Sequence, residues 1–505
     1  MKTLNYFLVS ISFLVGALPV NAAHYYLDAE RGDDSAKGTS PSQAWKTLDK
    51  LNALELQAGD FVFLRTGSVF EGQLKPKGSG TFAAPIILTA YGNGPKPRID
   101  GQGAFRATVF LKNLSHWVVR GIEITNTGAE PKANRLGVYL LADNAGVVKN
   151  ITLRNLFIHD VNGVISKDEG GGSGILWEVI SKKTPTRFEG LLIEDCHILR
   201  CDRDGIKGRK QPWDDLSYLS TNVVVRGNLL EHIGGDGIVP IGTDGALIEF
   251  NRIYEARDRF DPSTKEVSQY AGPSVGIWPW SSTNTLIRFN EVWGYRGTFD
   301  GQGYDSDFNC DGSTFEYNLS ANNAGGFFLI CNWAKHQDSG QSIGNSNTTI
   351  RHNISLNDHI RAFVINGPVS DVLIEKNIIY NTIEPKFQLL VDTPWGRFAE
   401  SVKVRDNLFY TTGEAHVYQG TWGGGGLGLW KYKGPLNSKT ISMQNNAYLN
   451  AHEHSETGMQ TLAPEQTLGS LIKELEKAPN SNADFREMLR FLRGSKYWEQ
   501  IKSVL

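Results

Sequence analysis

The sequence has 505 residues, and its 51 lysines and arginines nearly balance its 54 aspartates and glutamates, which gives a formal charge of −3. This balance argues against a nucleic acid or an anionic membrane surface as the partner. The length is sufficient to bury a large core, and a hydrophobic content of 40% is that of a globular protein.

The first residues have the features of a secretory signal. Lys2 precedes an apolar run over residues 6–20, and the small residue Ala22 follows it. A membrane anchor is the alternative, but the run is shorter than the roughly 18 apolar residues that a spanning helix needs. We therefore expect residues 1–22 to be a cleaved signal and the mature protein to be secreted or periplasmic, without a membrane partner.

Residues 23–98 differ in pattern from the rest of the chain. A strand from His24 is followed by a polar glycine-rich loop, an amphipathic helix starting near Ser42, and strands with alternating apolar positions. Because a solenoid needs a cover over its first unit, we expect this segment to form an N-terminal cap.

A repeated unit fills residues 99–450. Each unit has a short β-branched run, an asparagine, a second apolar run, a glycine-rich turn and a third strand, without a helical pattern. Three short strands per repeat predict one rung of a parallel β-helix. The aligned residues are Asn155, Asn228, Asn251, Asn290, Asn318, Asn353, Asn377, Asn407 and Asn446, with Cys196 in place of one asparagine. Stacked at about 4.8 Å, these side chains would hydrogen bond to one another and hold a turn.

The rungs, the asparagines and the N-terminal segment resemble the right-handed parallel β-helix superfamily of secreted polysaccharide-degrading enzymes. That superfamily includes pectate, alginate and chondroitin lyases, polygalacturonases and other glycoside hydrolases. The resemblance covers most of residues 24–450 and implies an all-β fold, a right-handed parallel β-helix. It also implies that glycans bind on the face made by the first strand of each rung and the turn before it. It does not select a reaction, since one fold hosts many activities.

The last part of the chain, residues 451–505, changes pattern. The segments TLGSLIKELEKAP and NADFREMLRFLRG have helical periodicity and end in proline and glycine. We expect a C-terminal helical cap.

Three turns on consecutive parts of the repeat are enlarged. They contain KDEGGGSGILWE after Asn155, ARDRFDPSTKEVSQYAGPSV after Asn251, and YRGTFDGQGYDSD after Asn290. Insertions on one edge of a solenoid would form the walls of a groove, and functional residues concentrate in such loops.

The first strands of successive rungs can be aligned on their glycine and isoleucine residues. Because strand residues alternate faces, this alignment sorts side chains into two columns. The inward column would be Ile206, Ile238, Ile277, Phe308 and Leu329, and the outward column Lys207, Val239, Trp278, Asp307 and Phe328. The same alignment makes Cys310 and Cys331 inward neighbours, either as a disulfide or as a reduced pair.

The outward surface collects the candidate catalytic residues Asp204, Asp236, Asp305 and Asp307. Carboxylates one or two rungs apart would be about 5 to 10 Å apart, the range that glycoside hydrolysis requires. Stacked acids also raise one another's pKa, which helps one of them stay protonated. Asp204 and Asp236 each precede Gly-Ile, so turn capping is the alternative for these two.

Other polar and aromatic side chains surround this predicted site. Candidate substrate-binding residues are Lys207, Arg209, Trp278, Trp280, Asp300 and Gln302. Tryptophans offer flat faces to sugar rings, and Lys207 and Arg209 would suit a carboxylate or sulfate. Asp300, Asp305, Asp307 and Asp311 are a candidate Ca²⁺ site, although their spacing is not that of an EF-hand. His232 is a spare candidate base, or a hydrogen-bonded structural histidine.

These residues predict a glycoside hydrolase acting on an acidic or sulfated polysaccharide. Asp236 or Asp305 would protonate the leaving oxygen, and Asp307 would activate water or attack the anomeric carbon; no cofactor is required. One alternative is a polysaccharide lyase in which Lys207 and Arg209 serve a β-elimination, or an epimerase on the same scaffold. Another is a non-catalytic glycan-binding β-helix. We expect a monomer in each case.

Overall fold

The computed structural model describes residues 22–257, 273–297, 300–422, 430–449, 460–461 and 482–504. The predicted signal, most of the enlarged turn after Asn251 and the predicted helix at 467–479 lie outside these residues. Among the helices described, none combines the length and the apolar character needed to cross a membrane.

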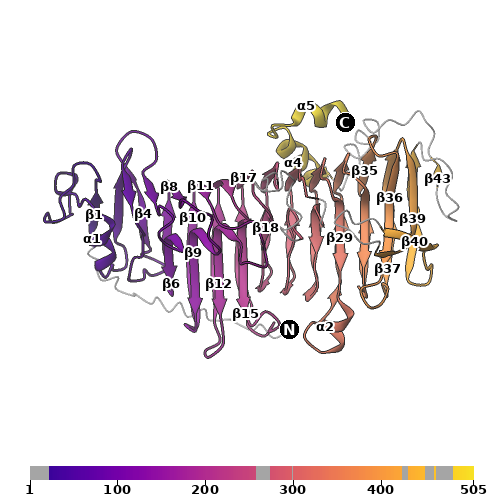
Figure 1. Ribbon diagram of the computed structural model, residues 1–505, viewed down its shortest axis with the longest axis horizontal. Coiled ribbons are helices and arrows are strands. Elements are labelled where there is room, and N and C mark those ends of the chain that lie inside the picture. The colour runs from indigo at the N-terminus through magenta and orange to yellow at the C-terminus, as the bar shows by residue number, and fades with distance from the viewer. Residues whose placement is uncertain are drawn as a thin grey trace, which may run out of the picture.

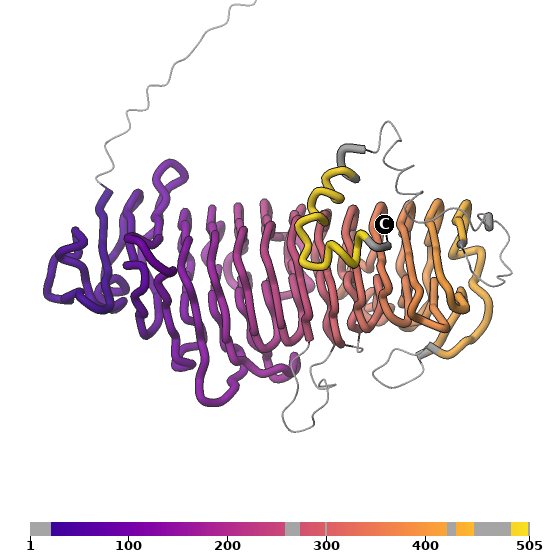
Figure 2. Tube along the Cα trace, turned by 90° about the horizontal axis from the view of Figure 1, so that it is seen from above, coloured from indigo at the N-terminus to yellow at the C-terminus, as the bar shows by residue number. Residues whose placement is uncertain are grey.

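Three faces of strands, parallel except for the antiparallel last pair of the third face, run along the long axis of the molecule, so the predicted parallel β-helix is confirmed (Figures 1 and 2). The longest face has the strands β1 (His24–Leu27), β2 (Phe61–Arg65), β4 (Ile86–Tyr91), β7 (Trp117–Arg120), β10 (Val147–Arg154), β13 (Arg187–Glu194), β16 (Ser220–Arg226), β19 (Thr243–Asp244), β20 (Leu247–Glu249), β22 (Ser282–Thr283), β23 (Leu286–Arg288), β26 (Cys310–Asp311), β27 (Thr314–Glu316), β30 (Asn345–Ser346), β31 (Thr349–Arg351), β34 (Val372–Glu375), β37 (Val402–Arg405) and β41 (Ile441–Gln444).

The second face follows it around the corner. Its strands are β3 (Val69–Glu71), β5 (Arg98–Asp100), β8 (Glu123–Asn126), β11 (Phe157–Val161), β14 (His197–Cys201), β17 (Leu229–Glu231), β21 (Arg252–Tyr254), β24 (Glu291–Trp293), β28 (Leu319–Ala321), β32 (Ile354–Leu356), β35 (Ile378–Asn381), β38 (Leu408–Thr411), β42 (Ala447–Leu449) and β43 (Gln460–Thr461).

The third face consists of two shorter sheets joined by single bridges. Its strands are β6 (Ala107–Lys112), β9 (Arg135–Asp143), β12 (Gly172–Ile180), β15 (Asp204–Gln211) and β18 (Ile238–Val239), then β25 (Gln302–Ser306), β29 (Gly326–Cys331), β33 (Arg361–Asn366), β36 (Lys386–Thr393), β39 (Glu414–Trp422) and β40 (Trp430–Gly434). Between the two sheets, Ile277 bridges Ile238 on one side and Tyr304 on the other. This interrupted face carries the candidate site.

The corner between the first two faces is held by the predicted asparagine ladder. Each asparagine from Asn228 to Asn407 donates its backbone N–H and its side-chain amide to the side-chain oxygen of the next one, over 2.9 to 3.1 Å. The ladder ends at Asn446, and Cys196 joins it through its backbone N–H to Asn228. Most of the residues just before these asparagines are not glycine and have a positive φ, such as Phe289 at 52°. The ladder bonds offset the cost of this left-handed bend.

Asn155 does not belong to the ladder, which corrects one of the predictions. It is exposed, and its side-chain oxygen accepts a hydrogen bond from the ammonium group of Lys96. Leu156, which is buried, occupies the ladder position of this rung. The alignment was wrong by one residue because an adjacent asparagine in the left-handed turn imitated the motif.

A continuous apolar core fills the inside of the solenoid and reaches its N-terminal end. There, the short helices η1 (Pro41–Gln43) and α1 (Leu48–Ala53) lie beside the first strands, and Leu48 and Leu51 of α1 join the core (Figure 1). The helix predicted to start near Ser42 thus begins only at Leu48, after the short turn η1, and its apolar side faces the first rungs.

The C-terminal helices α4 (Asn482–Leu492) and α5 (Trp498–Val504) lie along the flank of the solenoid (Figures 1 and 2). Their Met488, Leu489, Leu492 and Ile501 pack on apolar residues of the second face, which include Trp293 and Leu319. Arg252 of β21 donates a hydrogen bond to the carbonyl of Phe491. The prediction of a cap over the C-terminal end is thus wrong for these two helices.

Candidate active site

The third face brings most of the predicted polar residues together, although in a different register. Its inward column is Ile206, Ile238, Ile277, Tyr304, Phe328 and Phe363. The outward positions next to it are Lys207, Val239, Trp278, Asp305, Leu329 and Val364, and two residues further along each strand lie Arg209, Ile241, Trp280, Asp307, Cys331 and Asn366.

The predicted alignment was therefore wrong for the last two rungs. Asp305, not Phe308, pairs with Leu329, and Leu329 faces outward while Phe328 is in the core. Tyr304 takes the inward position that had been assigned to Phe308 because its hydroxyl reaches two backbone carbonyls inside the solenoid, at 2.9 and 3.0 Å. As a result, both Asp305 and Asp307 face outward.

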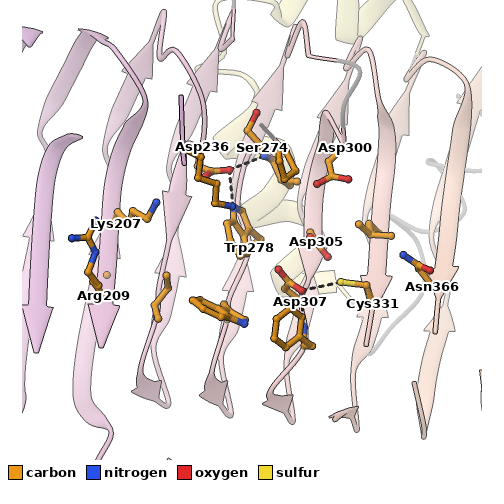
Figure 3. A pocket seen from close by; sticks show the side chains of 18 of the residues that line it. Lys207, Arg209, Asp236, Ser274, Trp278, Asp300, Asp305, Asp307, Cys331 and Asn366 are labelled. Atoms are coloured by element: carbon orange, nitrogen blue, oxygen red, sulfur yellow. Dashed lines mark hydrogen bonds between the residues drawn. The ribbon is translucent and has the colours of Figure 1, made fainter. Parts of the chain in front are cut away.

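A cavity of about 590 Å³ opens on this face (Figure 3). It is lined by Lys167, Lys207, Gly208, Arg209, Lys210, Asp236, Ile241, Pro273, Ser274, Val275, Trp278, Trp280, Asp300, Asp305, Asp307, Phe308, Leu329, Cys331, Asn366 and Trp395. Four carboxylic acids thus share one cavity of a size typical of ligand sites.

Asp236 is fully buried and its carboxylate has fixed partners. It accepts hydrogen bonds from the backbone N–H of Val275 at 2.9 Å and from the indole N–H of Trp278 at 3.0 Å, and it lies 3.2 Å from the Arg203 guanidinium. Burial raises its pKa, but the charges of Arg203, Lys167 and Lys207 bring the pKa down to about 2. Asp236 is therefore an ionised anchor for Trp278, and the expectation that it serves as a general acid is not supported.

Asp204 is paired with Lys207 and does not line the cavity. The Lys207 ammonium lies 2.9 Å from one oxygen of Asp204, and the Arg203 guanidinium lies 3.9 Å from the other. Buried ion pairs of this kind position side chains, and breaking one leaves a charge without compensation. The structure separates Asp204 from the acids that face the cavity.

The other three acids form a cluster around β25, with Asp300 before the strand, Asp305 in it and Asp307 after it (Figure 3). The carboxylate oxygens of Asp305 and Asp307 and the sulfur of Cys331 lie within 4.8 Å of one another. Burial raises the pKa of all three acids, and the two neighbouring carboxylates raise that of Asp305 further, well above its usual range.

Exposure and hydrogen bonding distinguish the three acids. Asp305 is only 3% exposed, whereas Asp300 and Asp307 are half-buried. Asp307 accepts a hydrogen bond from the backbone N–H of Phe308 at 2.7 Å and one from the Cys331 thiol at 2.9 Å. Burial raises the pKa of Asp307, these two donors oppose the rise, and the result is about 6. No donor among the described residues reaches the Asp300 carboxyl, whose pKa burial raises although Arg361 opposes the rise.

The cysteine prediction was wrong in both positions. Cys331 points into the cavity from β29, and Cys310 lies on the first face in β26. Both thiols are free, and all four cysteines are buried.

Only some of the predicted substrate-binding residues line the cavity. Arg209 lines the cavity and lies 3.8 Å from Glu178, and Trp278 is buried beneath the Lys167 ammonium at 4.9 Å from its ring centre. Trp280 lines the cavity and is half-buried. Gln302 is buried next to Gly326 and does not line the cavity.

Sequence reasoning found only Trp280 of an aromatic arc whose Trp280, Phe308 and Trp395 line the cavity. Its members are Trp213, Trp280, Phe308, Trp333, His336 and Trp395. Trp213 stacks on Trp280 with ring centres 5.2 Å apart, and Phe308 stacks on His336 of α2 (Ala334–Asp338) at 5.4 Å. The only signal in the sequence was a recurring tryptophan after several of the third-face strands.

Two further candidates lie elsewhere. Asp311 is in β26 on the first face and accepts hydrogen bonds from Ser346 and Asn347, so the proposed four-aspartate calcium set is not assembled. His232 follows β17 on the second face, 3.8 Å from Glu255, and does not line the cavity.

No family model matches the chain, but comparisons with known proteins find similar sequences and structures. A lacto-N-biosidase of Bifidobacterium longum subsp. longum is 29% identical in an alignment 450 residues long, which covers 70% of this chain and 27% of the relative. The chain thus spans about a quarter of the length of that relative.

Two solved structures of the GH136 lacto-N-biosidase from Eubacterium ramulus are also similar. The native protein has a TM-score of 0.61 and 30% identity over 71% of this chain and 64% of the other. The selenomethionine derivative has a TM-score of 0.64 and 26% identity over 84% and 67%. The resemblance to parallel β-helix enzymes acting on glycans is confirmed.

Proposed function

We propose that the protein is a glycoside hydrolase whose reacting groups are Asp300 and Asp307. The observation that carries the proposal is the acid cluster, in which neighbouring carboxyls in one cavity have different hydrogen-bond environments. Pairs of titratable groups whose surroundings separate their pKa values are typical of acid and base roles. The similarity to lacto-N-biosidases supports the same reaction class.

Asp307 is the nucleophile or base in this proposal. Two donors, the Phe308 N–H and the Cys331 thiol, stabilise its carboxylate form, which is the reactive form. Asp300 is the general acid because no described donor stabilises its charge and burial favours its protonated form. Both are half-buried in the cavity wall, so a sugar can reach them.

Asp305 has a supporting role. It is almost fully buried between the two, and both neighbours raise its pKa, so it stays protonated and adds no third negative charge. The paired aspartates of the sequence-based hypothesis therefore become Asp300 and Asp307, with Asp305 as the neutral neighbour.

The cavity favours a neutral glycan over the acidic or sulfated one first expected. Among the described cavity-lining cations, Lys207, Arg209 and Lys210 each have a carboxylate partner, at 2.9, 3.8 and 3.3 Å. The fourth, Lys167, lies over Trp278. Among the described lining residues, an acidic sugar would meet the acid cluster and only one cation, Lys167, without a carboxylate partner, whereas the aromatic arc offers faces to uncharged rings. We propose a glycan containing lacto-N-biose as the first substrate to test.

A lyase is less well supported. Its base would be Lys207, whose pKa burial lowers, but the Lys207 ammonium is held by Asp204 in a buried pair. A uronate carboxylate would also need a free cation for neutralisation.

The test is digestion of lacto-N-biose-containing oligosaccharides beside a panel of neutral and acidic polysaccharides. New reducing ends should appear with the neutral glycans, without absorbance from unsaturated uronate. The Asp307→Asn variant should lose this activity, and Trp395→Ala should raise KM with a smaller effect on kcat. Cleavage that Asp300→Asn and Asp307→Asn both retain, or unsaturated products from acidic glycans, would overturn the proposal.

A further inference from the structure

The cavity holds a group of soft and hard metal ligands that joins one of the proposed reacting acids to a buried carboxyl and a thiol. Asp305 and Asp307 of the β25 segment and Cys331 of β29 each offer one ligand atom, and these three atoms lie within 4.8 Å of one another. They belong to adjacent strands and point to the same side of the sheet (Figure 3).

A second observation points to a ligand at this place. One carboxylate oxygen of Asp305 is buried and has no hydrogen-bond partner, although the residue is only 3% exposed. Buried polar atoms are almost always satisfied in native proteins, and an unsatisfied one needs an explanation. A cation between the three side chains would satisfy it.

We infer that Asp305, Asp307 and Cys331 form a binding site for Zn²⁺ or another thiophilic divalent cation, and that the bound ion inhibits the enzyme. Two carboxylates and a thiolate match the ligand preferences of zinc, whereas Ca²⁺ takes oxygen ligands only. The cavity leaves the fourth position of a tetrahedral ion open. The inhibitory part rests on the proposed function, because the ion would occupy Asp307.

Binding replaces one hydrogen bond by metal–ligand bonds. The Cys331 S–H bond breaks and its proton leaves to solvent, Asp305 loses its proton as well, and the sulfur and both carboxylates bind the ion without any change of oxidation state. The Cys331 sulfur lies 2.9 Å from the Asp307 oxygen, and tetrahedral zinc geometry would widen that gap to about 3.5 Å. A side-chain rotation of this size requires no change in the strands.

The test is titration of the reduced, chelator-washed protein with metal alone. Co²⁺ should give a thiolate charge-transfer absorption at one equivalent, and Zn²⁺ should displace it. Cys331→Ser should abolish this absorption and weaken Zn²⁺ binding by about 100-fold or more, and Asp305→Asn by about 10-fold or more. Cys196→Ser, which changes a buried thiol remote from the cavity, is the matched control and should leave binding unchanged.

Binding that is absent, or that Cys331→Ser leaves unchanged, would overturn the inference, and circular dichroism of the variants would verify that they are folded. Activity is measured separately on whichever glycan is cleaved. Zinc should inhibit the native enzyme, and a chelator should reverse this inhibition. Metal binding without any glycan cleavage would contradict the proposed function but support the metal site. Glycan cleavage without metal binding would support the proposed function but contradict the metal site.

Discussion

The asparagine ladder and the acid cluster both bring polar side chains of one kind together, with opposite results. The ladder stacks asparagines from successive turns of the solenoid, whereas the cluster gathers three carboxyls within one turn, in and beside β25. In the ladder, each amide donates to the next oxygen and accepts from the previous residue, so Asn290 and Asn318 are fully paired. In the cluster, carboxyls only accept when ionised, and Asp305 keeps an oxygen without a partner.

The ladder therefore contributes to the stability of the fold, whereas the acid cluster contributes to its reactivity. An amide both donates and accepts hydrogen bonds, so the asparagine of each added rung provides an acceptor for the donors of the asparagine before it. A repeated carboxylate repels its neighbour, and the cost appears as raised pKa values in the cavity. Changing one member of each set should therefore separate effects on activity from effects on stability.

Asp307→Asn should have the largest effect and act on activity alone. Loss of the nucleophile or base should lower kcat/KM by about 10⁴-fold, which corresponds to about 5.5 kcal/mol. The thermal midpoint should stay the same or rise, because one repelling carboxyl is removed. Kinetics on the cleaved glycan and a melting curve measure both; a lower midpoint together with retained activity would contradict the proposed role.

Asp300→Asn should come next, with a loss of about 10²- to 10⁴-fold in kcat. A substrate whose leaving group needs no protonation should recover most of that loss, and the alkaline limb of the pH–rate profile should disappear. Kinetics with aryl glycosides of different leaving-group pKa measure this. An equal loss for all leaving groups would assign Asp300 to binding.

Asn318→Ala should act on stability alone. It leaves the Asn290 backbone N–H without its acceptor and removes the Asn318 side-chain donor to the Ile287 carbonyl, at a cost of about 2–4 kcal/mol in the free energy of unfolding. Denaturant midpoints measure the loss, with the exposed Asn93→Ala as control. An unchanged midpoint would mean that the ladder is dispensable.

Asp305→Asn should have the smallest effect, one that depends on pH. Because the folded pKa of Asp305 is raised, its contribution to stability is complete below its unfolded pKa and is lost as pH rises through the folded pKa. The free energy of unfolding of the variant, relative to that of the wild type, should therefore increase from acid to neutral pH by on the order of 1 kcal/mol. Melting temperatures between pH 4 and 8 measure the difference; a constant difference would show that Asp305 does not titrate differently on folding.

The sequence predicted the repetitive part of the molecule much better than the irregular part. Strand-forming runs and asparagines at regular positions define a rung, so the solenoid and most of its ladder were identified. The register of β25 failed because apolarity alone favours Phe308 as the inward residue. Only the backbone carbonyls of Asn290 and Leu319, one from a preceding rung, make Tyr304 the better choice.

The parts that the sequence could not supply are contacts between distant segments. The arc joins Trp213, Phe308 and Trp395 from three separate loops, and no local pattern links them. Likewise, the periodicity of α4 shows that one side is buried without showing what it is buried against. Helices joined to the last strands were expected at the end of the stack, but the apolar surface that fits them lies on its flank.

The position of α4 and α5 bears on how the solenoid is assembled during synthesis. Rungs contact mainly their neighbours, so they can stack one after another as the chain emerges. Glu291 and Tyr254 on the flank form hydrogen bonds with Ser495, which is synthesised some two hundred residues later. The middle rungs, which carry the acid cluster on their opposite side, are thus the last to lose their exposed apolar surface. A ribosome-bound chain that lacks only these helices should expose that flank to chaperones while its first rungs are already protected from proteolysis.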